Sequence, residues 1–117
     1  MIFTGAQVSD VSPLSNLVNL KYLNLITQVS DVSPLSNLVN LKELVLMDTK
    51  VSDISPLSKL KNLEYLDLSY CHGLSDISPL SNLVNLEKLD LSNCHGLSDI
   101  SSLDKLRKPG HILKIMT

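Results

Sequence analysis

Two cysteine–histidine pairs are the residues of this 117-residue chain whose types and spacing could do chemistry. The tripeptide Cys-His-Gly occurs at 71–73 and again at 94–96, and two cysteines with two histidines are a common ligand set for zinc. Adjacent side chains of an extended chain point in different directions, so we expect no metal at this motif. The glycines would instead supply a left-handed or tight turn, with His72 and His95 outside it.

A second regularity is a series of aspartates, each of which follows a serine. Its members are Asp10, Asp31, Asp53, Asp76 and Asp99. Carboxylates stacked about 5 Å apart would repel one another, which raises the possibility of bound calcium. The calcium-binding pattern Gly-Gly-x-Gly-x-Asp is absent, and aspartates commonly accept local hydrogen bonds from the backbone of a following turn. We expect these local bonds, without an ion.

No pattern of a catalytic site is present. His111 is the third histidine, and the sequence has no G-x-S-x-G elbow, no H-E-x-x-H and no phosphate-binding P-loop. The numerous serines are typical of turns. We therefore predict that the protein is not an enzyme and uses no cofactor.

Net charge and hydropathy limit the possible partners and location of the protein. Lys and Arg number 10 against 12 Asp and Glu, a formal net charge of -2, and no basic run alternates with aromatic residues, which argues against nucleic acid as a partner. The chain has no apolar stretch long enough to cross a bilayer and no signal-peptide pattern at its start. We expect a cytoplasmic protein with no membrane contact; a secreted or surface fragment is the alternative.

Internal repetition organises the rest of the sequence. The nonapeptide SPLSNLVNL occurs three times, with the variant SPLSKLKNL between the second and third copies: at 12–20, 33–41, 55–63 and 78–86. Alignment on Val/Leu-Ser-Asp gives a partial unit, four repeats and a degraded unit within one domain: 1–7, 8–28, 29–50, 51–73, 74–96 and 97–117. A unit this short has room for one strand, one turn and one short helical segment.

Leucines recur within each unit as Leu-x-x-Leu-x-Leu. The four sets are Leu20, Leu23, Leu25; Leu41, Leu44, Leu46; Leu63, Leu66, Leu68; and Leu86, Leu89, Leu91. The last two leucines of each set alternate with other residues, the pattern of a strand with one buried face. The return segment begins with Ser-Pro, where the serine could cap a 3₁₀ turn that starts at the proline. Each unit would thus make one coil of a right-handed solenoid.

These tandem units resemble the leucine-rich repeat family over residues 8–103. The stretch LVNLKELVLMDTKVSDISPLSKLKNLEYLDL is similar to the short subtype found in bacterial internalins and in a eukaryotic regulator of phosphatase-1. The resemblance implies an α/β solenoid with a concave parallel sheet of about five strands, 3₁₀ turns on the convex side, and a role in binding other proteins.

The family normally places an asparagine after the strand, where it bonds to the backbone of the turn and stacks in a ladder. In this chain that place falls to Thr27 or Gln28, then to Thr49, Cys71 and Cys94. Adjacent coils would bring the two cysteines within about 5 Å, a separation that a disulfide permits. Stacked side chains point in parallel, however, so free thiols are the favoured prediction and a disulfide is the alternative.

The repeats differ most at the strand positions that point away from the leucines. These positions, together with Tyr70, are the predicted partner-binding residues: Tyr22, Asn24, Ile26, Glu43, Val45, Met47, Tyr65, Asp67, Ser69, Lys88, Asp90 and Ser92. The same alignment places Ile112, Lys114 and Met116 in a fifth strand. Exposed tyrosine and methionine on a rigid surface suit protein recognition, and the acidic residues favour a partner with a basic or mixed patch.

We therefore predict a protein-binding scaffold that uses the concave face; a structural or self-assembling module without a partner site is the alternative. The partial first unit also predicts a weak homodimer, because Met1, Ile2 and Phe3 would cover the leucines of the first coil poorly. At the other end, Lys114 would blunt pairing of the sheet edge.

Overall fold

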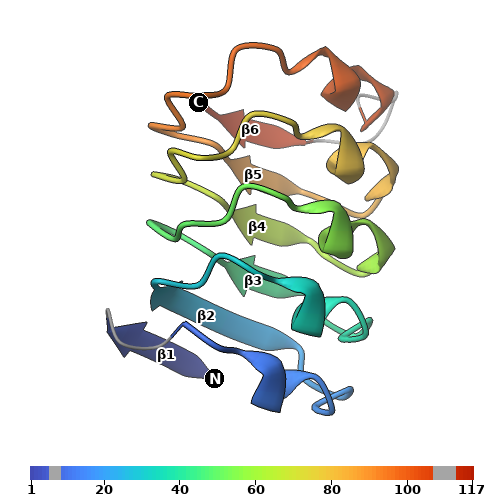
Figure 1. Cartoon of the computed structure of the whole chain (residues 1–117). Helices are drawn as coiled ribbons and strands as arrows, with labels where there is room; N and C mark the ends of the chain where they lie inside the picture. Colours follow the sequence, from blue (N-terminus) through green and yellow to red (C-terminus); the bar gives the residue numbers. More distant parts are fainter. Residues whose placement is uncertain (6–8, 107–112) are drawn as a thin grey trace.

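The computed structural model describes residues 1–5, 9–106 and 113–117, which form a solenoid built on one parallel sheet (Figure 1). The six strands lie side by side in chain order: β1 (Ile2–Gly5), β2 (Tyr22–Thr27), β3 (Glu43–Val45), β4 (Tyr65–Asp67), β5 (Lys88–Asp90) and β6 (Lys114–Met116). The predicted fold class is confirmed. The sheet has one strand more than the alignment gave, because the partial N-terminal unit forms β1 and pairs with β2.

In the described residues, five short 3₁₀ helices stack along the side of the solenoid away from the strands (Figure 1). They are η1 (Ser12–Leu14), η2 (Ser33–Leu35), η3 (Ser55–Lys59), η4 (Ser78–Asn82) and η5 (Ser101–Leu106). The predicted serine caps are wrong: in η1 to η4 the serine is already the first helical residue, and the Val or Ile before it takes the N-cap place without a side-chain bond. No helix in the described part of the chain is long and apolar enough to cross a membrane.

Equivalent leucines of successive coils stack into one continuous core. Leu44, Leu66 and Leu89 are partners in the sheet register and are fully buried. No coil could bury such a row alone, which is why the unit must repeat. The first coil is packed less closely than the others: Leu17 is 38% exposed, whereas its equivalents are fully buried, namely Leu38, Leu60 and Leu83.

Side-chain amides link the coils where each chain segment returns to the sheet. Asn40, Asn62 and Asn85 each donate a hydrogen bond through Nδ2 to a main-chain carbonyl of the preceding coil, at 2.8, 2.9 and 2.7 Å. The second asparagine of SPLSNLVNL therefore recurs because it joins neighbouring coils. The sequence alone did not indicate this role.

The turn after the strand is built differently from the prediction. Residues 72–73 and 95–96 do form turns, but the left-handed residues come earlier: Tyr70 and Asn93 each have φ 60°. Gly96 is needed for close packing instead, because a Cβ there would lie 3.1 Å from the Leu74 carbonyl oxygen. His72 and His95 are exposed, as predicted.

Candidate partner-binding face

Most of the predicted partner-binding residues lie on strands β2 to β6, on the face of the sheet opposite the leucine core. Four of them come after the end of a strand: Met47, Ser69, Tyr70 and Ser92. Along β2, Leu23 and Leu25 are buried while Tyr22 is 53% exposed. Of the remaining residues, Glu43, Tyr70 and Lys114 are exposed, and the half-buried ones are Asn24, Ile26, Val45, Met47, Tyr65, Lys88, Asp90, Ser92 and Met116. Ile112 lies outside the described residues.

Asp67 and Ser69 do not face solvent, in contrast to the prediction. Asp67 retains 7% and Ser69 3% of their possible exposure. Asp67 Oδ1 accepts hydrogen bonds from the Ser69 main-chain N–H at 2.9 Å and from the Ser69 hydroxyl at 2.6 Å, while its Oδ2 accepts one from the Tyr65 hydroxyl at 3.2 Å. These contacts hold both side chains against the sheet, so they offer little surface to a partner.

Tyr65 lies at the centre of the face and joins two strands. Its ring lies under Lys88, whose Nζ is 5.1 Å from the ring centroid, within the range of a cation–π contact. Burial, and secondarily the negative charge of Asp67, raises the pKa of Tyr65 to about 12. The hydroxyl therefore keeps its proton, and with it the bond to Asp67, to a higher pH than an ordinary tyrosine would.

A shallow depression of about 230 Å³ lies at the N-terminal end of the face. Its lining residues are Met1, Ile2, Tyr22, Leu23, Asn24, Glu43 and Val45. The Oδ1 atom of Asn24 is buried and has no hydrogen-bond partner among the described residues. An unpaired acceptor costs about 1–3 kcal/mol, so a ligand that brought a donor to this atom would recover part of that cost.

The ladder after the strand consists of buried, hydrogen-bonded side chains. Thr27, rather than Gln28, is the buried residue in the first coil, and Thr49 is buried in the next. Cys71 and Cys94 are free thiols, as favoured, and donate to the main-chain carbonyls of the preceding coil at 3.1 and 3.0 Å. Burial raises the pKa of both thiols, which disfavours the thiolate that metal binding or nucleophilic attack requires.

The two histidines of the repeated motif stack on each other outside this ladder. The rings of His72 and His95 are parallel, with centroids 5.0 Å apart. Within the described residues, no three His, Cys, Asp or Glu side chains are grouped as metal ligands.

The series of five aspartates accepts the local hydrogen bonds that the sequence predicted. In each case Oδ1 accepts the main-chain N–H of the serine two residues later, at 2.9 Å. This bond is the main reason that the pKa of each carboxyl lies below its usual value. The carboxylates therefore support the start of each 3₁₀ helix.

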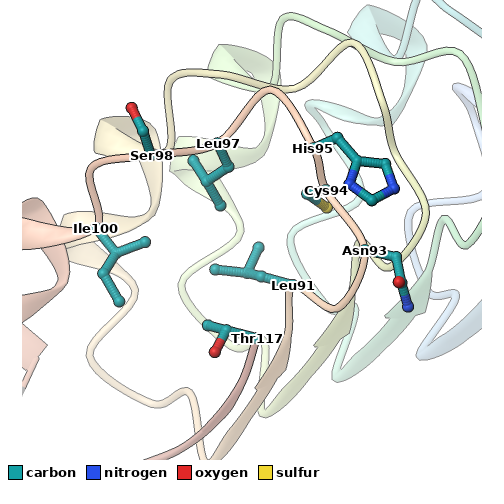
Figure 2. Close-up of a pocket in the computed structure, with 8 residues that line it drawn as sticks. All are labelled: Leu91, Asn93, Cys94, His95, Leu97, Ser98, Ile100 and Thr117. Atoms are coloured by element: carbon teal, nitrogen blue, oxygen red, sulfur yellow. The ribbon is translucent and has the colours of Figure 1, made fainter.

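A pocket of about 560 Å³ opens at the C-terminal end of the solenoid, which the sequence analysis did not anticipate (Figure 2). Its lining residues are Leu91, Asn93, Cys94, His95, Leu97, Ser98, Ile100 and Thr117. Figure 2 shows Leu91, Leu97 and Ile100 directed into the pocket, while Ser98 points away. In the sequence, only the degraded repeat at 97–117 indicated that the C-terminal end of the solenoid differs from the other coils.

Comparisons with known proteins point to one family. The family model of leucine-rich repeats in two copies matches residues 39–82 and 61–105, whereas the comparison with curated protein sequences gave no match. Among solved structures, the internalin InlF of Listeria monocytogenes str. 4b F2365 is 37% identical over 90% of this chain, with a TM-score of 0.77. Internalin C2 of the same strain is 31% identical over 97%, with a TM-score of 0.66.

A plant receptor shares the fold as well. The leucine-rich repeat ectodomain of the Arabidopsis receptor kinase HAESA, in complex with an N-terminally extended IDA peptide hormone, is 25% identical over 92% of this chain, with a TM-score of 0.69. The present chain spans 37% of InlF, 58% of internalin C2 and 19% of the HAESA chain. On the strength of the family model, the leucine register and the stacked 3₁₀ turns, the chain belongs to the leucine-rich repeat family.

Proposed function

We propose that this protein is a non-catalytic scaffold that recognises a partner protein through the concave face of its sheet. The leucine-rich repeat fold is commonly an interaction scaffold, and the HAESA ectodomain carries a bound peptide hormone. In this chain the core positions repeat almost without change, while the outward strand positions vary from coil to coil. That division suits a constant framework with one specific surface.

The observation that carries the proposal is the conformation of Tyr70. Its φ of 60° is left-handed, and the equivalent residues of the neighbouring coils are Asp48 and Asn93, with φ 57° and 60°. Asp and Asn adopt this conformation readily, whereas a tyrosine incurs a cost of about 1 kcal/mol. Tyr70 is also 46% exposed, so packing does not fully offset that cost. A strained, exposed aromatic residue is typical of a contact site.

The face also has a distinct distribution of charge for a partner to match. Glu43 lies exposed on β3, whereas Lys88 and Lys114 lie at the equivalent positions of β5 and β6. The Tyr65–Lys88 contact lies between these two regions. We therefore expect the partner to present a mixed patch, with its basic part toward β3 and its acidic part toward β6.

Paired surface variants test the proposal. Tyr22→Ser with Tyr70→Asn removes two exposed tyrosines of the predicted partner-binding set, one at the start of β2 and one in the turn after β4. Val39→Ser with Val84→Ser removes two valines of similar exposure, 45% and 49%, that lie on the return segments before β3 and β5. Affinity capture followed by mass spectrometry should recover a partner with wild-type protein and with the valine variant, but not with the tyrosine variant. Equal capture by both variants, at equal thermal stability, would refute the concave face as the site.

We also propose weak homodimerisation through the N-terminal edge. A groove of about 380 Å³ is present there, lined by Met1, Asn16, Leu17, Val18, Asn19 and Leu20. Met1 is 52% and Ile2 72% exposed, so two such edges could bury apolar surface together. The side chain of Phe3, which the sequence analysis included in this edge, lies outside the described residues.

A further inference from the structure

One row of side chains across the concave face places a single carboxylate between two tyrosines. Tyr22 of β2 is the register partner of Glu43 in β3, and Glu43 is the partner of Tyr65 in β4. Each of these three strands has a neighbour on both sides. Glu43 is exposed, and its charge acts on Tyr65, whose pKa is raised by burial, by Asp67 and, to a smaller extent, by Glu43. These three residues therefore form an anionic site flanked by aromatic rings, the Tyr22–Glu43–Tyr65 site.

The next strand along shows which group such a ring contacts within the protein. Lys88 of β5 follows Tyr65 in the same row, and its Nζ lies 5.1 Å from the centre of the Tyr65 ring. Tyr22 has the same relation to Glu43 in the register, but the charge of its neighbour is reversed. No ion pair joins Glu43 to another of the described residues. A cation above Glu43 would therefore meet a carboxylate and a tyrosine on either side.

The spacing of the strands suits a cation between the two tyrosines. Adjacent strands lie about 4.8 Å apart, so the backbones of β2 and β4 are about 10 Å apart along this row. A cation midway between them, above Glu43, would lie about 5 Å from each tyrosine, within the range of a cation–π contact. The Tyr65–Lys88 contact has a similar length.

We propose that the Tyr22–Glu43–Tyr65 site binds the guanidinium group of an arginine side chain of the partner protein, an inference that rests on the proposed role of the concave face. A guanidinium pairs with a carboxylate through two parallel N–H bonds and stacks on aromatic rings, whereas an ammonium group is a compact, strongly hydrated charge. The aliphatic part of the arginine packs on Val45, which lines the depression beside Glu43.

Asn24 provides a second reason for a ligand with several donors. It lines the same depression as Glu43, and its Oδ1 atom has no hydrogen-bond partner among the described residues. Arginine has five N–H donors in a fixed geometry, enough for both the carboxylate and this amide oxygen. The site thus combines charge, aromatic faces and an unpaired acceptor, and arginine matches all three.

An NMR titration of the full chain tests the site. The probe is N-acetyl-arginine amide, and its uncharged isostere N-acetyl-citrulline amide is the matched control. The chain has three tyrosines, so the ring signals of Tyr22 and Tyr65 can be followed while Tyr70, in the turn after β4, serves as the internal reference. The arginine probe should shift the first two signals, the citrulline probe should shift neither, and N-acetyl-lysine amide should bind more weakly than the arginine probe.

Single substitutions locate the bound cation. Glu43→Gln should weaken binding of the arginine probe about fivefold, whereas Glu87→Gln, at an exposed glutamate just before β5, should leave it unchanged. Tyr22→Leu, which keeps an apolar side chain without the ring, should weaken binding about threefold. Equal binding of the citrulline or lysine probe, unchanged affinity in Glu43→Gln, or no ring shift at the highest soluble concentration of the arginine probe would overturn the proposal.

Affinity capture separates this inference from the proposed function. A partner that is lost with Tyr22→Ser and Tyr70→Asn, but captured by Glu43→Gln as well as by the wild type, would leave the concave face as the binding site and overturn the arginine alone. Equal capture by the wild type and the tyrosine variant would refute the concave face, and with it the arginine of a partner.

Discussion

Replacing Asp67 with alanine should destabilise the protein much more than the same change at Asp90, the partner of Asp67 in the neighbouring strand. Asp67→Ala leaves the main-chain N–H of Ser69 without an acceptor at a residue that is 3% exposed, at a cost of about 1–3 kcal/mol. The bond from the Ser69 hydroxyl at 2.6 Å is lost as well, which adds about 1 kcal/mol. We expect about 2–4 kcal/mol in total.

Asp90→Ala is the matched control. Asp90 Oδ1 accepts one bond, from the Ser92 main-chain N–H at 2.9 Å, and Ser92 is only half-buried, so water can replace the carboxylate. The expected loss is about 0.5–1.5 kcal/mol. Urea unfolding followed by circular dichroism gives both values. If Asp67→Ala lost no more stability than Asp90→Ala, the three hydrogen bonds of Asp67 would not explain its burial.

Three further perturbations test other parts of the structure. Leu66→Ala should lower the free energy of unfolding by about 2–5 kcal/mol in urea melts, because the side chain is fully buried; a loss below that of Asp90→Ala would place it outside the core. The pKa of Asp53 is lowered by the bond from Ser55, so its stabilising effect is complete above the unfolded value of 3.8 and is lost as pH falls through the lower folded value. Asp53→Asn, which keeps an acceptor but does not titrate, should reduce the drop in melting temperature between pH 5 and 2; an unchanged drop would contradict this. Ile2→Lys should remove any concentration-dependent rise in mass in light scattering, and a wild-type chain that stays monomeric at every concentration would refute the N-terminal dimer.

The core and the sheet register could be predicted because each depends on spacing within one repeat. Leu23 and Leu44 point inward for the same reason as Leu66, since the alternation along a strand fixes the face of every residue. Repetition then fixes the stacking, because identical units pack most readily in one register. The bonds of the aspartate series were predictable on the same grounds: an aspartate and the backbone two residues later form a local contact that needs no knowledge of distant residues.

What the sequence did not show depends on contacts between side chains. Alternation alone places Asp67 and Ser69 outward, and they do lie on that face, but their burial comes from bonds to each other and to Tyr65. The helix cap was assigned to serine because serine is a good cap residue, whereas the side chain that accepts a bond at the start of each helix belongs to the aspartate two residues earlier. The C-terminal pocket joins the turn after β5 to Thr117, a contact between residues far apart in the sequence that spacing within one repeat does not show.

Tyr70 has a backbone conformation that tyrosine disfavours, although its side chain is exposed. The repeat requires a left-handed residue there, and the coils on either side meet the requirement with Asp48 and Asn93. Tyr70→Asn should therefore raise the free energy of unfolding by about 1 kcal/mol, since little packing is lost from a side chain that is 46% exposed. If the tyrosine serves recognition, the same variant should bind the partner more weakly while it melts at a higher temperature. A lower melting temperature would show that Tyr70 contributes to folding, and the argument that links its strain to binding would fail.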